Sequence, residues 1–245
     1  RQLDLILTAR SQDKLEALAK ELGDRHGIKT HCIPLDLSLP GAAAALRDRI
    51  SDGGLTVDWL INNAGFGDYG AFGEGDRANS LAMVNINITA LMELTYDFLP
   101  AMVKRGSGTV VNLASIAGYQ PLPYMALYAA TKAFVLNFSE ALWAENKDRG
   151  VRILGLCPGP TGTEYLKTAD FPAAIAPSPN AAATPEAVVA EALNALDAGK
   201  ANCVTGGLAN KALVNSGRFF PRGWLAKSIG GMFKPSNAVK ETNSS

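Results

Sequence analysis

The sequence predicts a doubly wound α/β domain, in which helices cover both faces of a parallel sheet. Three observations predict this fold. Residues 109–113 and 151–156 are short, almost continuously apolar runs, as expected for strands that helices bury on both faces. Longer stretches with helical periodicity separate such runs, which is the βαβ alternation of a parallel sheet. Small and polar residues follow the runs, where the carboxyl ends of parallel strands share one rim.

Three strands, with helices between them, are predicted in the first half of the chain. Residues 3–9 form an apolar run of strand length, and a pattern with one apolar helical face follows. Residues 29–35 predict the second strand, and Ser38 marks the beginning of an alanine-rich helix that extends to position 50. Residues 57–62 predict the third strand. It ends at a turn of small residues, which lets a ligand approach the backbone.

The same alternation continues through the second half of the chain. The last helix of this half is predicted between Pro185, at its first position, and Gly199, beyond its end. The predicted elements are, in order, a helix over residues 80–102, a strand over 109–113, a helix over 125–147, a strand over 151–156, a helix over 185–197 and a short strand near 202–205.

We expect one large α/β domain over residues 1–207, including a flap over residues 162–184 that is rich in alanine, proline and small polar residues. Residues 208–245 are expected to form a C-terminal extension packed on the same domain. Positions 206–240 carry basic and aromatic residues and no acidic residue. Such a segment can lie on a membrane surface or cover an apolar substrate. We favour the alternative, in which the aromatic side chains pack over the end of the sheet and the lysines stay solvated.

Composition excludes several classes of protein. The chain has 245 residues, 47% of them hydrophobic, with 23 basic and 23 acidic residues, so no overall field attracts nucleic acid. Three widely spaced cysteines favour free thiols in a reducing, cytoplasmic compartment over a disulfide framework. His26 and His31 lack acidic or cysteine partners at ligand spacing, so we expect no metal site. No apolar run reaches the roughly 20 residues that span a bilayer.

The segment from Ser115 to Lys132 carries a hydroxyl, a phenol and an ammonium group at chemically useful spacing. If residues 125–147 are helical, Tyr128 and Lys132 lie one turn apart on the same face. A cation within about 4–6 Å lowers the pKa of a phenol by roughly 1–3 units, so Tyr128 could transfer a proton near neutral pH. Ser115 follows a predicted strand and could hold a substrate oxygen. Alone, the three residues also fit an ordinary helix surface and a loop serine.

With its neighbours, this segment resembles the classical short-chain dehydrogenase/reductase family, over almost the whole chain from position 3 to about position 207. Each motif alone is weak, but their order and spacing agree with the family. The motifs are Asn62-Asn63-Ala64-Gly65 after a strand, Asn87-Ile-Thr-Ala in the next helix, Ser115, Tyr128-x-x-x-Lys132, and Pro158-Gly159 followed by Thr163. The resemblance implies a Rossmann-like, three-layer oxidoreductase.

The resemblance implies a catalytic role for four residues. Tyr128 would be the general acid in carbonyl reduction, or the base in alcohol oxidation, and Ser115 would hydrogen-bond the substrate oxygen. Lys132 would hold the nicotinamide ribose and lower the pKa of Tyr128, and Asn87 would support a water path that returns the proton. The implied reaction is hydride transfer between a nicotinamide cofactor and a small-molecule carbonyl or alcohol.

The resemblance also implies where the cofactor would bind. The implied adenine side comprises Asp36, Leu37, Asn63, Ala64 and Gly65, and the nicotinamide and phosphate side comprises Pro158, Gly159, Thr161 and Thr163, beside Tyr128 and Lys132. An acidic residue at the ribose favours NAD, whereas an arginine accommodates the 2′-phosphate of NADP. Arg10 follows the run over residues 3–9, and the first acidic residue after it is Asp13. We therefore predict NADP, with Arg10 on the adenine or the phosphate; a solvated turn arginine is the alternative.

The family normally begins with a strand, a glycine-rich turn that binds pyrophosphate, and a helix. Nothing in the sequence matches that turn, and residues 3–9 correspond to the second strand of the family. We therefore expect an N-terminally incomplete record of an ordinary enzyme, in which the first strand and helix are missing. The rival expectation is a chain that folds differently and binds the cofactor poorly.

Two other functions stay open at this point. The chain could be a non-catalytic interaction protein on a dehydrogenase fold, or an epimerase or dehydratase that uses a bound nicotinamide. Several aromatic and apolar residues follow the predicted strands and could line an apolar substrate pocket; the alternative is that they simply pack in the core or under the flap. These residues are Phe66, Tyr69, Phe72, Tyr119 and Leu122. The resemblance also implies homodimers or homotetramers, formed through the helices that begin near Met125 and Pro185.

Overall fold

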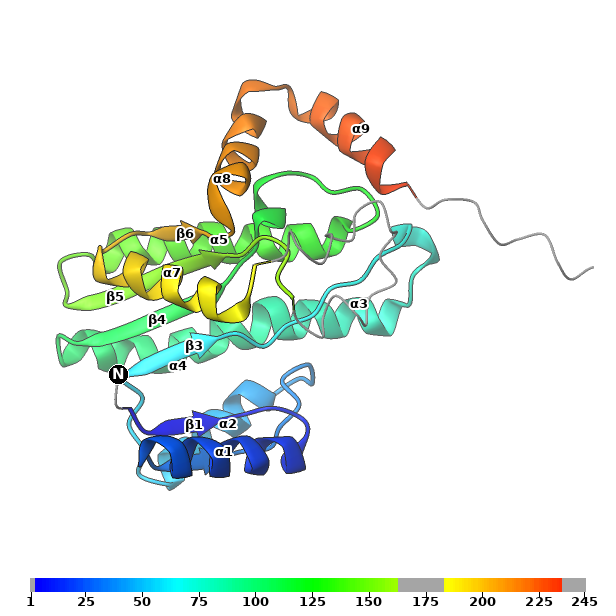
Figure 1. Ribbon diagram of the computed structural model, residues 1–245. Helices are drawn as coiled ribbons and strands as arrows, with labels where there is room; N and C mark the ends of the chain where they lie inside the picture. The colour runs from blue at the N-terminus through cyan, green and yellow to red at the C-terminus, as the bar shows by residue number, and fades with distance from the viewer. Residues whose placement is uncertain (1–2, 163–182, 235–245) are drawn as a thin grey trace, which may run out of the picture.

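The computed structural model describes residues 3–162 and 183–234 and confirms the predicted α/β class (Figure 1). Most of the predicted flap, and the end of the C-terminal extension, lie outside these residues. The elements are β1 (Leu5–Leu7), α1 (Gln12–His26), β2 (Thr30–Cys32), α2 (Ala42–Asp52), β3 (Trp59–Asn62), η1 (Phe72–Glu74), α3 (Arg77–Val84), η2 (Asn85–Ala90), α4 (Leu91–Lys104), β4 (Gly108–Leu113), η3 (Ile116–Tyr119), α5 (Ala126–Asn146), β5 (Val151–Cys157), α7 (Pro185–Asp197), β6 (Asn202–Val204), α8 (Gly207–Ser216), η4 (Gly217–Phe219) and α9 (Arg222–Phe233).

The strands form two separate parallel sheets within the described part of the chain. β1 pairs with β2, whereas β3, β4, β5 and β6 pair in that order. In the larger sheet Leu60 lies opposite Val110, and Val110 lies opposite Ile153. Figure 1 shows β1, α1 and α2 as a unit beside β3 and α4, set apart from the larger sheet. The sheet is therefore interrupted between β1 and β3.

Helices cover both faces of the larger sheet, because its strands are apolar on both sides. Val110 of β4 packs in one cluster with Leu94 and Met102 of α4. The next residue, Val111, points to the other face and packs with Val188 of α7. Successive side chains of a strand point to opposite faces, so one apolar run supplies both cores. Burying each such side chain contributes about 1.5–3 kcal/mol.

The observed elements differ from the predicted ones mainly at their ends. β1 and β2 have three residues each, fewer than the apolar runs that predicted them, because the two strands pair only over that length. The helix predicted over residues 80–102 begins at Arg77 and has three parts, α3, η2 and α4. Its middle part is π-helical, and such segments are frequent at functional sites.

The C-terminal helices α8 and α9 pack at one end of the larger sheet (Figure 1). Val214 of α8 belongs to a cluster with Val204 of β6, and Ile229 of α9 packs with Leu122 and Met125. Phe233 packs against that second cluster. The rings of Phe220 and Trp224 stack on each other and stay largely exposed, as does Phe219. Within residues 3–162 and 183–234, no helix has both the length and the apolarity to cross a membrane.

Candidate active site

The predicted catalytic residues gather where β3 and β4 end, next to the first turns of α5. Lys132 reaches the end of β4, because its Nζ donates a hydrogen bond to the carbonyl oxygen of Leu113 at 2.6 Å. Asn87 reaches the loop after β3, because its Nδ2 donates to the carbonyl oxygen of Phe66 at 2.9 Å. Carboxyl ends of parallel strands are the usual ligand-binding rim of an open α/β sheet. The structure therefore brings the predicted catalytic residues together at this rim.

Lys132 is a buried ammonium group, with 5% of its surface exposed. Burial disfavours the charged form and lowers its pKa from 10.5 to about 8. Its Nζ lies 5.8 Å from the centroid of the Tyr128 ring, within the range of a cation–π contact. The i, i+4 spacing thus brings the two side chains together, as predicted from helix geometry.

Tyr128 is half-buried at the edge of a small apolar cluster. The cluster contains Leu122, Met125 and Ile229, so one side of the ring packs against residues from η3, α5 and α9. The hydroxyl group of Thr131 donates to the backbone carbonyl oxygen of Tyr128 at 2.8 Å. These contacts hold the tyrosine backbone and ring in place beside the buried lysine.

Ser115 follows β4 and begins the short helix η3. Its Oγ accepts a hydrogen bond from the backbone N–H of Ala117 at 3.1 Å. A serine hydroxyl carries one donor and two acceptor sites, so its O–H stays available to a substrate oxygen. The next residue, Ile116, donates its N–H to the carbonyl oxygen of Pro158 at 3.1 Å. This bond joins the serine loop to the Pro158-Gly159 loop after β5.

Asn87 is buried in η2, and its side chain joins the loop after β3 to α5. Its Nδ2 donates to Phe66 O and, at 3.0 Å, to Thr131 Oγ1, and its Oδ1 accepts from Phe66 N at 3.1 Å. Gly65 packs directly against it, because a Cβ at position 65 would lie 2.6 Å from Asn87 Oδ1. The same Cβ would lie 3.7 Å from Lys132 Nζ. Only glycine fits between the two side chains.

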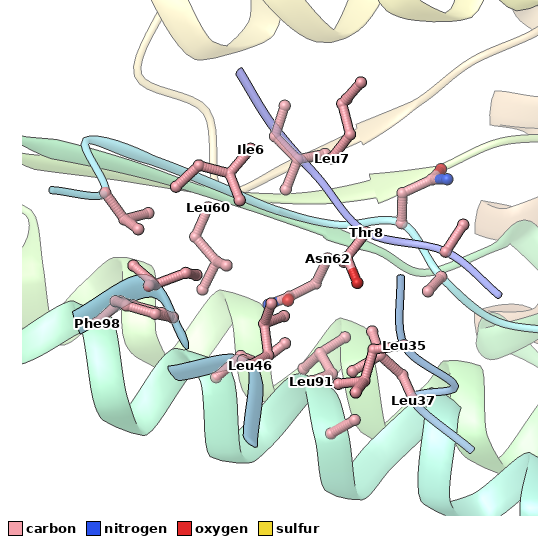
Figure 2. A pocket seen from close by; sticks show the side chains of 18 of the residues that line it. Ile6, Leu7, Thr8, Leu35, Leu37, Leu46, Leu60, Asn62, Leu91 and Phe98 are labelled. Atoms are coloured by element: carbon pink, nitrogen blue, oxygen red, sulfur yellow. The ribbon is translucent and has the colours of Figure 1, made fainter. Parts of the chain in front are cut away.

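Residues predicted for the adenine side line one end of a cavity of about 1180 Å³ (Figure 2). Asp36 accepts hydrogen bonds from Ser38 N at 2.9 Å and Ser38 Oγ at 2.6 Å. These bonds, with a smaller contribution from the positive charge of Arg10, lower the pKa of Asp36. Leu37 is buried, whereas Arg10 is exposed. The cavity residues from this predicted set are Arg10, Asp36, Leu37, Asn63, Ala64 and Gly65.

The Pro158-Gly159 loop is held from the side of α8. A Cβ at Gly159 would lie 2.1 Å from Nδ2 of Asn210, and Asn210 donates to the carbonyl oxygen of Thr205 at 2.8 Å. Thr161 Oγ1 donates to the carbonyl oxygen of Gly159 at 3.0 Å. Thr163, the last residue predicted for this side, lies outside the described residues.

Two residues at the site, Thr131 and Asn210, and one contact of Tyr69 were not predicted from the sequence. Thr131 lies inside the Tyr-x-x-x-Lys motif, and its position one turn after Tyr128 could have been inferred from that motif, but its contact with Asn87 on η2 could not. Asn210 gives no local signal for its contact with Gly159. The hydroxyl of Tyr69 donates to the carbonyl oxygen of Phe233 at 2.6 Å, across a separation of 164 positions. Tyr69 thereby ties α9 to the loop after β3.

Comparison with known proteins identifies the family. Residues 1–171, more than half of the chain, match the family described as short chain dehydrogenase. The chain belongs to this family. Its members are oxidoreductases that bind small-molecule substrates. The observed parallel α/β fold and the residues gathered around Tyr128 agree with that assignment.

Among the curated relatives of this short-chain dehydrogenase is the very-long-chain 3-oxoacyl-CoA reductase of Mus musculus. The two are 32% identical over 182 residues, which is 71% of this chain and 58% of the mouse protein. Sulfoacetaldehyde reductase of Chromohalobacter salexigens is 37% identical over 163 residues, covering 66% of this chain and 64% of that protein. The chain therefore spans less than two thirds of the length of these relatives.

Solved structures of similar fold cover nearly the whole dehydrogenase chain. A short-chain dehydrogenase from Sphingobium yanoikuyae in complex with NADPH has a TM-score of 0.76 and 29% identity, over 98% of this chain and 89% of that one. A 7beta-hydroxysteroid dehydrogenase has a TM-score of 0.82 and 25% identity, over 93% and 87% of the two chains.

Proposed function

We propose that this short-chain dehydrogenase transfers a hydride between NADP(H) and a carbonyl or alcohol substrate, with Tyr128 as the general acid or base. The observation that carries the proposal is the buried Lys132 ammonium, 5.8 Å from the centre of the Tyr128 ring. An ammonium in a site of low polarity favours the phenolate strongly, because little water screens the two charges. A tyrosine on a helix surface without this lysine would not exchange protons near neutral pH.

The proton step uses residues of this chain alone. In the reducing direction the Tyr128 hydroxyl donates its proton to the substrate oxygen, and Lys132 stabilises the phenolate that remains. The Ser115 hydroxyl donates a hydrogen bond to the same oxygen, which gains negative charge as the carbonyl becomes an alkoxide. Asn87 fixes Thr131 and the loop after β3 around this pair. In the oxidising direction the phenolate takes the proton of the alcohol.

The residues present fit a nicotinamide dinucleotide at both of its ends. Gly65 packs tightly against Asn87 on one side. On the other side, Asn63, Ala64 and Gly65 of the loop after β3 are exposed at the rim, where a cofactor can approach their backbone. Asp36 and Arg10 would hold the adenosine end, and Lys132 would hold the nicotinamide ribose. Bound NADPH supplies the hydride that the protein itself cannot provide.

The preference for NADP rests on Arg10. Its guanidinium lies close enough to Asp36 to lower the pKa of that carboxyl group, at the rim where the adenosine would bind. An arginine forms paired hydrogen bonds with a phosphate, whereas an acidic residue there would repel it. The similar Sphingobium structure is described as a complex with NADPH, which is consistent with this choice.

The aromatic and apolar residues around Tyr128 favour an apolar carbonyl compound as the substrate. Tyr69 and Phe233 pack on the same apolar cluster as Tyr128, and the ring of Tyr124 lies beside that of Tyr69, with centroids 6.3 Å apart. Burial raises the pKa of Tyr69, so its phenol stays neutral. Two of the similar proteins are described as a very-long-chain 3-oxoacyl-CoA reductase and a 7beta-hydroxysteroid dehydrogenase, whereas a third is described as a sulfoacetaldehyde reductase. We propose a ketone on a fatty acyl chain or a sterol-like ring as the substrate class.

We propose a homodimer or homotetramer as the assembly, through the helices α5 and α7. Both helices present apolar side chains to solvent, namely Phe134, which is 37% exposed, and Val189, which is 54% exposed. A second copy of the chain packed against α5 and α7 would bury these two side chains. Light scattering during size-exclusion chromatography tests the proposal, and a monomer at micromolar concentration would contradict it.

The test of the proposed reaction is steady-state kinetics with NADPH and with NADH over a panel of ketones. We expect a higher kcat/KM with NADPH, and a loss of about 10²–10⁴-fold in kcat for Tyr128→Phe. Arg10→Asp should reverse or abolish the cofactor preference, whereas Arg25→Asp, on the exposed side of α1, should leave it unchanged. A clear preference of the unaltered protein for NADH would reject the NADP assignment.

A further inference from the structure

The C-terminal helices carry aromatic side chains that the fold leaves uncovered. Phe219 is 82% exposed and Trp224 is 54% exposed, although such side chains usually bury most of their surface. The sequence favoured packing of the aromatic residues over the end of the sheet. Phe233 packs in this way, whereas Phe219, Phe220 and Trp224 stay exposed. We call these three residues, together with Arg222, the aromatic tip.

The aromatic tip lies at one end of the molecule. Figure 1 shows α8 leaving the larger sheet beside β6, with the turn between α8 and α9 at the top of the view. This turn contains η4 and continues through Phe220 and Pro221 to the beginning of α9. The helices α1 and α2 lie at the opposite end. The rings therefore project from the body of the domain, where they can meet a flat surface.

The turn that carries the rings is well packed. The rings of Phe220 and Trp224 stack, with centroids 4.8 Å apart and an interplanar angle of 24°. The carbonyl oxygen of Pro221 accepts from Trp224 N at 3.0 Å and from Leu225 N at 3.1 Å, which begins α9. A Cβ at Gly217 of η4 would lie 3.7 Å from Cδ1 of the buried Leu225. The exposed rings are thus fixed on a short, ordered turn.

The outer face of α9 continues the exposed surface of the tip. Leu225 and Ile229 are buried, one turn apart, and form the inner face of the helix. Trp224, Lys227 and Ser228 are exposed at spacings of three and four, so they share the outer face. A large ring and a cation therefore lie next to each other on the side that the domain does not cover.

The charge around the tip is positive. Arg222 and Lys227 of α9 are exposed, and so are Lys211 of α8 and Lys234 just after α9. No acidic residue occurs between positions 206 and 240, although the whole chain has equal numbers of basic and acidic residues. The local excess of cations gives this end of the molecule a positive field, which attracts an anionic surface.

We propose that the aromatic tip docks the protein on the surface of an anionic lipid bilayer. The rings would enter the boundary between headgroups and acyl chains, about 5–10 Å deep, and the nearby cations would contact the headgroup phosphates. A bilayer accepts a projecting group of rings without a matching pocket. A second copy of the chain fits less well, because a symmetric contact through the tip would bring the same cations together.

Docking through the tip would bring the bilayer close to the proposed active site. On its inner face α9 contributes Ile229 to a cluster with Leu122 and Met125, and Tyr128 packs against this cluster. One helix thus separates the outer face of α9 from the proposed catalytic tyrosine. The docking itself does not depend on hydride transfer, so its test needs neither a cofactor nor a ketone.

The test is co-sedimentation of the full chain with lipid vesicles. One set of vesicles is phosphatidylcholine alone, and the other contains about 30% phosphatidylglycerol. We expect binding to the anionic vesicles to be at least about tenfold stronger in about 0.1 M salt. This difference should disappear in about 1 M salt, because the screening length then falls to about 3 Å.

Tryptophan fluorescence reports which part of the protein meets the lipid. Anionic vesicles with brominated acyl chains should quench the unaltered protein, because the ring of Trp224 would lie next to those chains. Trp224→Phe should bind the same vesicles with little quenching, since Trp59 and Trp143 lie outside the C-terminal helices.

Matched variants make the test specific. Phe219→Ser should weaken vesicle binding at least about fivefold. Tyr96→Ser, at a similarly exposed aromatic residue of α4, should not. Circular dichroism verifies that these variants are folded.

A pair of double variants tests the charges. Arg222→Glu with Lys227→Glu should weaken binding to the anionic vesicles at least about tenfold. Lys20→Glu with Lys104→Glu makes the same change in net charge on α1 and α4 and should have little effect.

Three results would overturn the proposal. The first is that the folded protein does not bind the anionic vesicles. The second is that the control variants weaken binding as much as the tip variants do, because the tip would then not be the docking surface. The third is self-association in solution that Phe219→Ser abolishes, without binding to vesicles, which would mean that a second copy of the chain covers the tip.

Discussion

At the scale of single residues, the proposed chemistry depends on a lysine that the fold buries at a cost. The sequence predicted the proximity of Tyr128 and Lys132, because the spacing of four is a property of any helix. It did not predict that Lys132 also reaches the carbonyl oxygen of Leu113, since that contact depends on how α5 packs on β4. Burial of the ammonium has a measurable consequence for stability.

Replacing Lys132 by methionine should stabilise the cofactor-free protein at neutral pH. The pKa of Lys132 is lowered from 10.5 to about 8, so the unfolded chain binds more protons than the native one between these values. The cost of burial, up to about 3 kcal/mol, is fully present below pH 8 and disappears as the pH rises to the unfolded pKa. The excess stability of Lys132→Met should therefore shrink between pH 8 and pH 10.5. Urea unfolding of both proteins across this range measures it, and a constant difference would contradict the assignment.

Gly65→Ala should disturb the site through Asn87. The new Cβ would lie 2.6 Å from Asn87 Oδ1, so the asparagine or the loop must move. We expect a loss of about 1–3 kcal/mol in the free energy of unfolding, together with a reduced kcat. Gly73→Ala is the control, because nothing lies within 4 Å of a Cβ at that position. Equal stability of the two variants would show that position 65 tolerates a side chain.

At the scale of elements, periodicity predicted which helices and strands exist more reliably than where they end. The helix over residues 185–197 was predicted with its observed bounds, because Pro185 and Gly199 mark its ends chemically. The π-helical segment η2 carries no such mark. It depends on tertiary bonds such as that from Asn87 to Thr131, which no local pattern contains.

The packing of α9 near Tyr128 gives a prediction at this scale. Tyr69→Phe removes the hydrogen bond to the carbonyl oxygen of Phe233 and should loosen the end of α9. We expect faster hydrogen exchange in α9 and a higher KM for an apolar ketone, with little change in kcat. Tyr96→Phe is a suitable control, because Tyr96 is 79% exposed on α4. Unchanged exchange in α9 would mean that the helix is held by its apolar contacts alone.

At the scale of the whole molecule, the sequence predicted the alternation of strands and helices and the rim that carries the site. Ser115, Tyr128 and Lys132 could be placed there because the carboxyl ends of parallel strands always share one edge. The division into two sheets follows from strand pairing, which local pattern does not contain. Leu5 and Ile61 are equally apolar in the sequence, yet only the structure shows that their strands border a groove.

The central claim is that hydride from NADPH reaches a substrate carbonyl under the control of Tyr128. Mass spectrometry of the alcohol formed from an apolar ketone and NADPH that carries deuterium at both C4 positions of the nicotinamide tests it most directly. We predict an alcohol that carries one deuterium on the former carbonyl carbon, formed by the unaltered protein and lost with Tyr128→Phe. An alcohol without deuterium, or equal deuterium transfer by Tyr128→Phe, would contradict the claim.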